Sequence, residues 1–244
     1  ISVIQIIFDT MSMIMPIYFV LATFCIVVYA YQLAAYLNTV YYKEKKMSFR
    51  KLLKDKGCRG EYRTSQQFEK LIPNAKMIFN AYISKNETET TEIDIIVISK
   101  YGIYVVENKN YKGWIFGDEK SQKWCQHLSK KKKFFFYNPI KQNNTHIESL
   151  RALLKENNLE KEIRSYVCFN GNAVFKKMNV SSPNIVVTKS ADLYKHIDKS
   201  VEYITSEEVH KIYTLLKPYT KVSEDKKRQH IDSIKSKYKN EQNF

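Results

Sequence analysis

Residues 93–110 read IDIIVISKYGIYVVENKN and contain two apolar runs of strand length, separated by the stretch SKYG at 99–102. Ile and Val are common in strands, and SKYG supplies turn residues, so the pattern predicts an antiparallel hairpin. Each run is continuously apolar, which indicates strands that are covered on both faces. This excludes a simple exposed meander.

Three charged residues, Asp94, Glu107 and Lys109, stand at the far ends of the two runs. If the loop is 99–102, Asp94 lies directly opposite Glu107, with Cβ atoms about 4.5–5.5 Å apart, where like charges destabilise a sheet. A divalent cation between them would remove the repulsion. Because strand side chains alternate with a period of two, Lys109 projects on the same side as Glu107. Two carboxylates and an ammonium are therefore expected to converge.

The order Asp, turn, Glu-x-Lys resembles the catalytic signature of the PD-(D/E)XK, or restriction-endonuclease-like, nucleases, with Glu107-Asn108-Lys109 as the E-x-K element. The wider pattern is similar to the nuclease-related domain, NERD. The matching pieces, about half of the chain, are Gly60-Glu61, Tyr101–Glu107, Tyr111–Trp114, Asn138-Pro139 and Gln142-Asn143. The resemblance implies an α/β restriction-endonuclease-like core, in which helices flank a small mixed sheet with a central antiparallel hairpin.

The resemblance also assigns roles. In the family, the first helix brings an acidic residue to the metal site, which here is Glu61, and a glutamine near the active site corresponds to Gln142. The implied metal ligands are Asp94, Glu107 and Glu61. The implied catalytic residues are Lys109, Glu107, Asp94, Glu61 and Gln142.

The residues themselves permit simpler interpretations. Residues 59–72 predict a helix that Pro73 ends, and Glu61 lies on its apolar face, where a carboxylate needs a partner. The alternative is a glutamate that the helix dipole stabilises. Gln142 has the alternative of a polar helix cap. His146, one turn later, is expected to be an ordinary surface or helix-start histidine.

The implied chemistry is hydrolysis of a phosphodiester bond. Two carboxylates suffice for Mg²⁺ (or Mn²⁺), which usually keeps several waters and would activate one of them. Lys109 would position the water or offset developing negative charge. The alternative is an ion-paired cluster in which Lys109 only neutralises Glu107.

The charge balance predicts a polyanionic partner. The 244 residues carry a formal charge of +15, from 40 basic and 25 acidic residues, which suits nucleic acid (DNA or RNA) or an anionic membrane surface. Lys130, Lys131, Lys132 and Lys133 precede the aromatic run 134–137, a combination that would grip phosphates and stack bases. The alternative is a solvated charge run followed by a buried strand. The four scattered cysteines indicate neither a zinc site nor a disulfide framework.

The N-terminal region predicts a membrane anchor. No charged residue occurs between Thr10 and Tyr42, and Met13–Tyr31 has the length of about 20 residues that crosses a bilayer. The basic segment that follows, 43–58, would be cytoplasmic by the positive-inside rule. It would also suit anionic headgroups, or it is only a solvated flank. We therefore expect a single-pass protein of the cell membrane with its soluble domain in the cytoplasm.

The expected organisation is an anchor at 1–42, the basic segment at 43–58, a NERD-like nuclease domain at 59–218 and a lysine-rich polar tail at 219–244. Outside the hairpin, the predicted strands are 76–84, 165–169 and 185–188, and the predicted later helices are 190–196 and 206–216. The expected function is a membrane-anchored, metal-dependent nuclease. The alternative is a catalytically silent nucleic-acid-binding or membrane-associated interaction protein that retains the fold.

Overall fold

The computed structural model describes residues 3–86, 89–129 and 132–222. The chain divides into two compact units, Ile1–Phe49 and Arg50–Phe244. Of the predicted polar tail, 223–244 lie outside the described residues, and the short 3-10 helix η2, Lys217–Thr220, covers its beginning.

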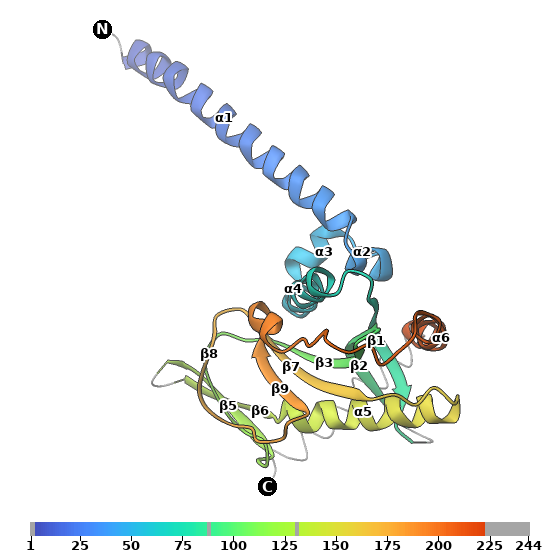
Figure 1. The fold of residues 1–244 in the computed structure, drawn as a ribbon. Helices are drawn as coiled ribbons and strands as arrows, with labels where there is room; N and C mark the ends of the chain where they lie inside the picture. Colours follow the sequence, from blue (N-terminus) through green and yellow to red (C-terminus); the bar gives the residue numbers. More distant parts are fainter. Residues whose placement is uncertain (1–2, 87–88, 130–131, 223–244) are drawn as a thin grey trace. The chain divides into compact units, whose positions relative to one another are not determined.

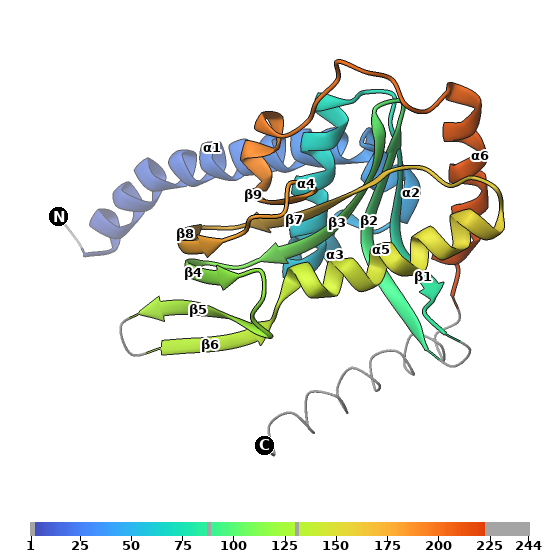
Figure 2. The same ribbon diagram turned by 60° about the horizontal axis from the view of Figure 1, so that its bottom comes forward.

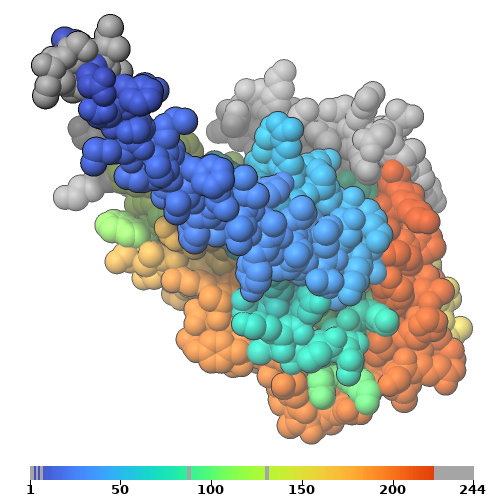
Figure 3. Space-filling view, turned by 90° about the horizontal axis from the view of Figure 1, so that it is seen from above, coloured from blue at the N-terminus to red at the C-terminus, as the bar shows by residue number. Residues whose placement is uncertain are grey.

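The first unit is dominated by one long helix, α1, Val3–Leu37 (Figure 1). Its part Phe8–Leu37 is long and apolar enough to cross a membrane, and the predicted Met13–Tyr31 lies inside it. Most of the large apolar side chains from Phe8 to Leu37 are exposed along the helix (blue in Figure 3). The helix contains Pro16, which membrane helices tolerate.

After α1 the chain turns and forms the short helix α2, Val40–Lys45, which Thr39 caps by accepting a hydrogen bond from the backbone N–H of Tyr42. The Tyr36 hydroxyl donates to the carbonyl of Met47 over 2.8 Å, and its ring lies 5.3 Å from that of Phe49. The predicted basic segment is thus largely helical. It contains the end of α2, all of α3 (Phe49–Lys54) and the start of α4 (Lys56–Leu71).

The second unit is built on a five-stranded sheet with the order β1-β2-β3-β7-β9. Its strands are β1 Lys76–Ser84, β2 Thr90–Ser99, β3 Gly102–Asn110, β7 Ile163–Asn170 and β9 Ile185–Lys189. The first three are antiparallel, and β7 and β9 run parallel to β3. The predicted mixed α/β architecture is confirmed.

The register of the central hairpin is as predicted: Ile95 pairs with Val106 and Ile98 with Ile103. The turn is tighter than expected, because Ser99 and Gly102 also pair and leave only Lys100-Tyr101 as the loop. Continuing this register places Asp94 opposite Glu107. On β1, Asn80 has φ of 51°, and the ladder shows pairs on either side of it but none between Asn80 and Asp94.

Helices cover both faces of this sheet (Figure 1). One core joins the Ile and Val side chains of β1, β2 and β3 to α5, Pro139–Glu156, and α6, Ser206–Leu216. On the other face, Phe68 of α4 contacts the rings of Tyr104 and Tyr166 at 5.7 and 6.2 Å. Because β3 side chains alternate, Glu107 and Lys109 project toward α5, whereas Asn108 projects toward α4.

A second, four-stranded sheet with the order β6-β5-β4-β8 was not predicted. Its strands are β4 Gly113–Asp118, β5 Lys123–Ser129, β6 Lys132–Tyr137 and β8 Ala173–Asn179, and the β5–β6 ribbon extends away from the first sheet (Figure 2). One face forms a core of its own around Trp124, Ile115 and Phe169.

Two glycines carry the chain from the first sheet to the second. The parallel pair β3 and β7 continues as the parallel pair β4 and β8, and the Gly113 N–H donates to the Asn172 carbonyl over 3.0 Å. Gly113 and Gly171 have φ of 82° and 72°, and a Cβ on Gly171 would lie 2.7 Å from the carbonyl oxygen of Tyr111. Only glycine adopts this conformation readily and leaves room for the neighbouring backbone.

Three local expectations need correction. The run after the lysines is a strand, β6, but it is not buried: Phe134 and Phe135 are 50% and 70% exposed, because the ribbon projects beyond the core. Residues 190–195 form a 3-10 helix, η1, rather than an α-helix. Strand β8 was missed, because its sequence, AVFKKMN, does not alternate regularly between apolar and polar residues.

Helix α4 approaches β3 so closely that Gly60 is required. A Cβ there would lie 2.5 Å from Nδ2 of Asn108, whose amide oxygen is held by Thr64 and Asn170 and does not yield freely. We expect Gly60→Ala to lower the free energy of unfolding by about 1–3 kcal/mol, as overpacking does, despite the higher helix propensity of Ala. Urea denaturation measures this.

The matched control is Gly57→Ala in the first turn of the same helix. Its new methyl would meet only the Asp55 carboxylate, at 3.3 Å. Equal effects of the two substitutions would contradict the close approach at Gly60.

Candidate active site

The candidate site lies where β2 and β3 meet, between α4 and α5. Its centre is an ion pair in which Lys109 Nζ is 2.6 Å from Glu107 Oε1, and the two side chains are 16% and 2% exposed. Lys109 Nζ also donates to Gln142 Oε1 over 3.0 Å. The predicted proximity of these three residues is therefore present in the fold.

The second oxygen of Glu107 contacts a residue that the sequence analysis misjudged. His146 is 3% exposed, and its Nε2 lies 3.1 Å from Glu107 Oε2. Its Nδ1 lies 2.6 Å from Oγ1 of Thr91. The expectation of an ordinary surface histidine was wrong, because α5 turns this position onto β2 and β3. The available signal was its spacing of four residues from Gln142, which places both on one helical face.

These contacts assign the hydrogen on the histidine ring. The ionised carboxylate of Glu107 only accepts hydrogen bonds, so Nε2 of His146 must carry a hydrogen. In the neutral tautomer, Nδ1 then accepts from the Thr91 hydroxyl. We call Glu61, Asp94, Glu107, Lys109, Gln142 and His146 the polar cluster.

Asp94 occupies a different electrostatic environment from Glu107. Its Oδ2 accepts a hydrogen bond from the backbone N–H of Asn108 over 2.8 Å, which links the middle of β2 to the last residues of β3. Burial raises the pKa of Asp94 well above its usual range, and the nearby carboxylates of Glu107 and Glu61 raise it further, whereas Lys109 opposes them. These causes place the carboxylates of Glu107 and Glu61 each close to that of Asp94.

Glu107 and Lys109 stabilise each other's charge. Burial acts to raise the pKa of Glu107, but Lys109 and His146 outweigh it and hold that pKa below its usual value. Burial likewise acts to lower the pKa of Lys109, and Glu107 overcomes this and raises it. The polar cluster thus pairs an ionised carboxylate with one that holds its proton to higher pH.

Glu61 reaches the cluster from the opposite helix layer and is 8% exposed. A buried polar network fixes its helix: the hydroxyl of Thr64 donates to Oδ1 of Asn108, and Nδ2 of Asn170 donates to the same oxygen over 2.8 Å. The Thr64 hydroxyl is also 2.7 Å from that of Ser190. These contacts join α4, β3, β7 and η1, and sequence reasoning did not find them.

Helix α5 is positioned by two buried asparagines. The Asn138 side chain accepts from the N–H of Ile140 as the helix cap, and its amide donates to three carbonyls of the β4–β5 turn, including that of Ser121 at 2.7 Å. Asn143 donates to the carbonyl of Val105 and the hydroxyl of Ser165. Gln142 and His146 are therefore held at fixed positions over β3.

The donor atoms of the cluster suit a hard cation, but the arrangement is not a complete metal cage. Carboxylate oxygens are the ligands that Mg²⁺ prefers, and one or two suffice. Among the described residues, no group of three His, Cys, Asp or Glu side chains is placed to hold an ion. Both oxygens of Glu107 are engaged by Lys109 and His146. The residues fit a site of few protein ligands centred on Asp94.

The predicted nucleic-acid-binding lysines are only partly described. Lys130 and Lys131 lie outside the described residues. Lys132 and Lys133 are exposed at the start of β6, in the second sheet.

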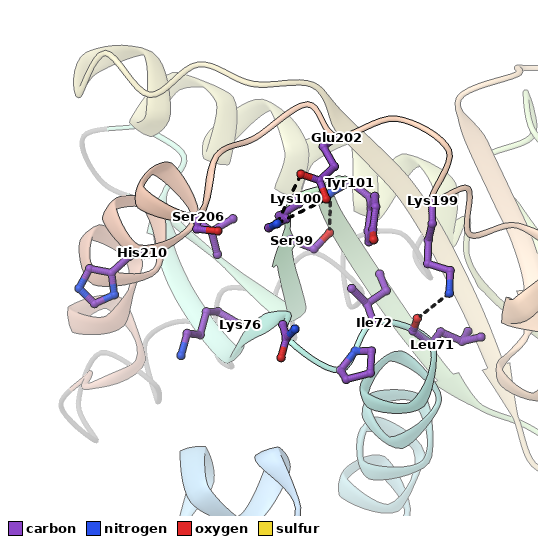
Figure 4. A pocket seen from close by; sticks show the side chains of 13 residues that line it. Leu71, Ile72, Lys76, Ser99, Lys100, Tyr101, Lys199, Glu202, Ser206 and His210 are labelled. Carbon is purple, nitrogen blue, oxygen red and sulfur yellow. Dashed lines mark hydrogen bonds and ion pairs between the residues drawn. The ribbon is translucent and has the colours of Figure 1, made fainter.

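A hollow of about 300 Å³ opens elsewhere, at the turn end of the hairpin (Figure 4). Its charged groups are engaged: Lys100 pairs with Glu202 at 3.4 Å, and Lys199 donates to the carbonyl of Leu71. It contains no member of the polar cluster, and we do not assign the chemistry to it.

Comparison with known proteins supports the sequence resemblance. The family model described as nuclease-related domain, NERD, matches residues 56–170, a range that contains the whole polar cluster. An uncharacterized protein of Bacillus anthracis is 32% identical over 185 residues, which span 75% of this chain and 85% of the relative. No solved structure matches the chain.

Asp94 is expected to destabilise the metal-free fold at neutral pH. Its pKa is about 3.9 when unfolded and is raised in the fold, so between these values the folded chain binds more protons than the unfolded chain. Stability then falls as pH rises through this window and stays lower above it. We expect Asp94→Asn to raise the free energy of unfolding at pH 8, with the gain vanishing near pH 4, measured by urea denaturation in EDTA.

Asp118→Asn provides the matched control. Asp118 is only partly buried, and hydrogen bonds from Asn179 and the Lys120 N–H lower its pKa, so removing its charge gives no gain at pH 8. A pH dependence left unchanged by Asp94→Asn would contradict the electrostatic account of the cluster.

His146→Phe is expected to lower the free energy of unfolding by about 1–3 kcal/mol, because it leaves buried oxygens of Glu107 and Thr91 without their partner. Denaturant unfolding measures the loss. His210→Phe at an exposed position of α6 is the control, and a surface change of this kind stays within about 0.5 kcal/mol. If both variants unfold alike, His146 has no structural part in the cluster.

Proposed function

The chain belongs to the nuclease-related domain family, and from this membership and the geometry of the polar cluster we propose that it is a metal-dependent nuclease hydrolysing phosphodiester bonds in DNA or RNA. The observation that carries the proposal is the convergence of side chains from four elements. They are Glu61 from α4, Asp94 from β2, Glu107 and Lys109 from β3, and Gln142 from α5. A restriction-endonuclease-like core is part of the same proposal.

The ammonium of Lys109 is held in a position and a charge state that suit an anionic substrate. The pKa of Lys109 is raised, so its ammonium stays charged, and Glu107 and Gln142 fix its position. A fixed ammonium stabilises charge that develops on the scissile phosphate without reorganising during the reaction. His146 acts on Lys109 indirectly, since it holds the carboxylate to which the ammonium is paired.

Asp94 is the residue best placed to bind the proposed metal ion. The carboxylates of Glu107 and Glu61 repel its charge and raise its pKa, and a cation beside it would offset that repulsion. The proposed ligands for Mg²⁺ or Mn²⁺ are Asp94, Glu107 and Glu61. When bound, the ion would act as a Lewis acid at the phosphate and lower the pKa of a bound water.

The proposed location is the cell membrane, with α1 as a single-pass anchor and the nuclease domain in the cytoplasm. The support is the apolar length of Phe8–Leu37 and the basic residues that follow it, which the positive-inside rule places on the cytoplasmic side. Nucleic acid and the membrane are the proposed partners.

One observation favours a second candidate function. Both oxygens of Glu107 are already engaged, and a carboxylate neutralised in this way need not bind a metal. The second candidate is a catalytically silent nucleic-acid-binding or membrane-associated protein that retains the fold.

The deciding experiment incubates the full chain, in detergent micelles, with labelled DNA and RNA in Mg²⁺, Mn²⁺ or EDTA. We expect cleavage that requires the metal and that falls about 100-fold or more in Asp94→Asn, Glu107→Gln and Lys109→Met, the scale of losing one electrostatic stabiliser of a transition state.

Glu92→Gln is the matched control, because Glu92 lies on the same strand as Asp94 and bonds to the amide of Asn80 instead of the cluster. It should retain the activity of the unmodified chain. Cleavage that survives both Asp94→Asn and Glu107→Gln would refute the proposed site, and binding without cleavage in either metal would favour the silent protein.

A further inference from the structure

The second sheet has one face that its own core does not use. The pairing register aligns side chains into two rows across the four strands. One row is Val174, Trp114, His127 and Lys133, and the other is Lys177, Phe116, Cys125 and Phe135. The residues that alternate with them along the strands point to the opposite side, and among these Ile115 and Trp124 pack in the buried core. We call the face that carries the two rows the outer face.

Aromatic rings are presented on the outer face. Phe135 is 70% exposed and Trp114 is 45% exposed, values unusual for large rings within strands. The ring centroid of Phe116 lies 4.5 Å from that of His127, so these two rings contact each other on the same face. Next to it, Phe116, Cys125 and Lys177 line a hollow of about 280 Å³.

The charge on these strands is almost entirely positive. The four strands contain the lysines Lys123, Lys132, Lys133, Lys176 and Lys177, and their one acidic residue is Asp118 at the end of β4. Lys176 stands over the ring of Trp114, with Nζ 4.9 Å from the ring centroid. Ammonium groups thus border the aromatic surface.

We propose that the outer face binds single-stranded nucleic acid, with bases stacked on Trp114 and Phe135 and phosphates against Lys133, Lys176 and Lys177. The inference rests on the proposed function and names its substrate class. Stacking requires access to the faces of the bases, which only an unpaired strand provides, and a positive sheet surface with exposed aromatic rings supplies both contacts.

The position of the outer face in the chain links it to the polar cluster. Strand β4 begins at Gly113, four residues after Lys109, so their Cα atoms are at most about 14 Å apart. A single-stranded nucleic acid bound on the second sheet therefore lies close to the end of β3, where hydrolysis is proposed.

The test measures binding in EDTA, where metal-dependent cleavage does not occur, with the full chain in neutral-lipid nanodiscs. Fluorescent single-stranded DNA and RNA are compared with a duplex of equal length. We expect tighter binding of the single strands. Trp114→Ala and Phe135→Ala should each weaken it about ten-fold, which corresponds to the loss of one stacked base.

Phe134→Ala is the matched control, because Phe134 is also half exposed but pairs with Gln126 on the other side of the same strand. Phe134→Ala should leave binding unchanged.

The double variant Lys176→Gln, Lys177→Gln tests the phosphate contacts. The slope of log affinity against log salt concentration should become less steep by about 1.4, which is about 0.7 for each lysine that no longer neutralises a phosphate.

Several outcomes would overturn the proposal. They are equal effects of Phe134→Ala and Phe135→Ala, or equal affinity for duplex and single strand. In separate nanodiscs that contain brominated anionic lipid, quenching of Trp114 fluorescence would assign the face to the membrane. A shift from dimer to monomer in Phe135→Ala, with oligonucleotide binding intact, would assign it to a second copy of the chain. If binding follows the proposal but no metal supports cleavage, the proposed function fails and the binding face stands.

Discussion

The structure depends on the buried charge of Glu107. A carboxylate that is 2% exposed is too costly to leave unpaired, and removing one partner of a buried pair is more damaging than removing both. Lys109 and His146 supply its partners, and His146 comes from α5, so the charge forces helix and strand to stay together. The asparagines at 138 and 143 then make the position of α5 rigid by satisfying backbone groups of both sheets.

Asp94 is also a carboxylic acid in the buried cluster, but its pKa is raised instead of lowered. It lies across from Glu107, and with one ammonium shared between the two carboxylates, only Glu107 has its pKa lowered. An arrangement in which neighbouring carboxyl groups are driven to different pKa values is typical of acid–base sites. The raised pKa of Asp94 is the feature of the cluster that an ion pair between Glu107 and Lys109 does not by itself explain.

The contacts of this site that could be predicted from the sequence are those between residues close together in the chain. The hairpin register followed from local alternation and a short turn, and it placed Asp94, Glu107 and Lys109 correctly. Gln142 was identified by family resemblance and does contact Lys109. His146 was misjudged, because whether a helical residue is buried depends on how the helix is rotated against the sheet. The second sheet was missed for a similar reason: its strands are short, and only tertiary packing on Trp124 decides which of their faces is covered.

The connection between the two sheets fixes the position of the second sheet relative to the polar cluster. Strands β3 and β7 leave the first sheet side by side and re-form as β4 and β8, with Gly113 and Gly171 making both bends. Two parallel connections hold the second sheet more firmly than a single tether, because neither bend can change without disturbing the other. The end of β3 that carries Lys109 is therefore also the fixed starting point of the aromatic, lysine-rich surface. The protein backbone between that surface and the cluster contains no flexible linker, so a polyanion bound on the surface is held at a fixed distance from the cluster.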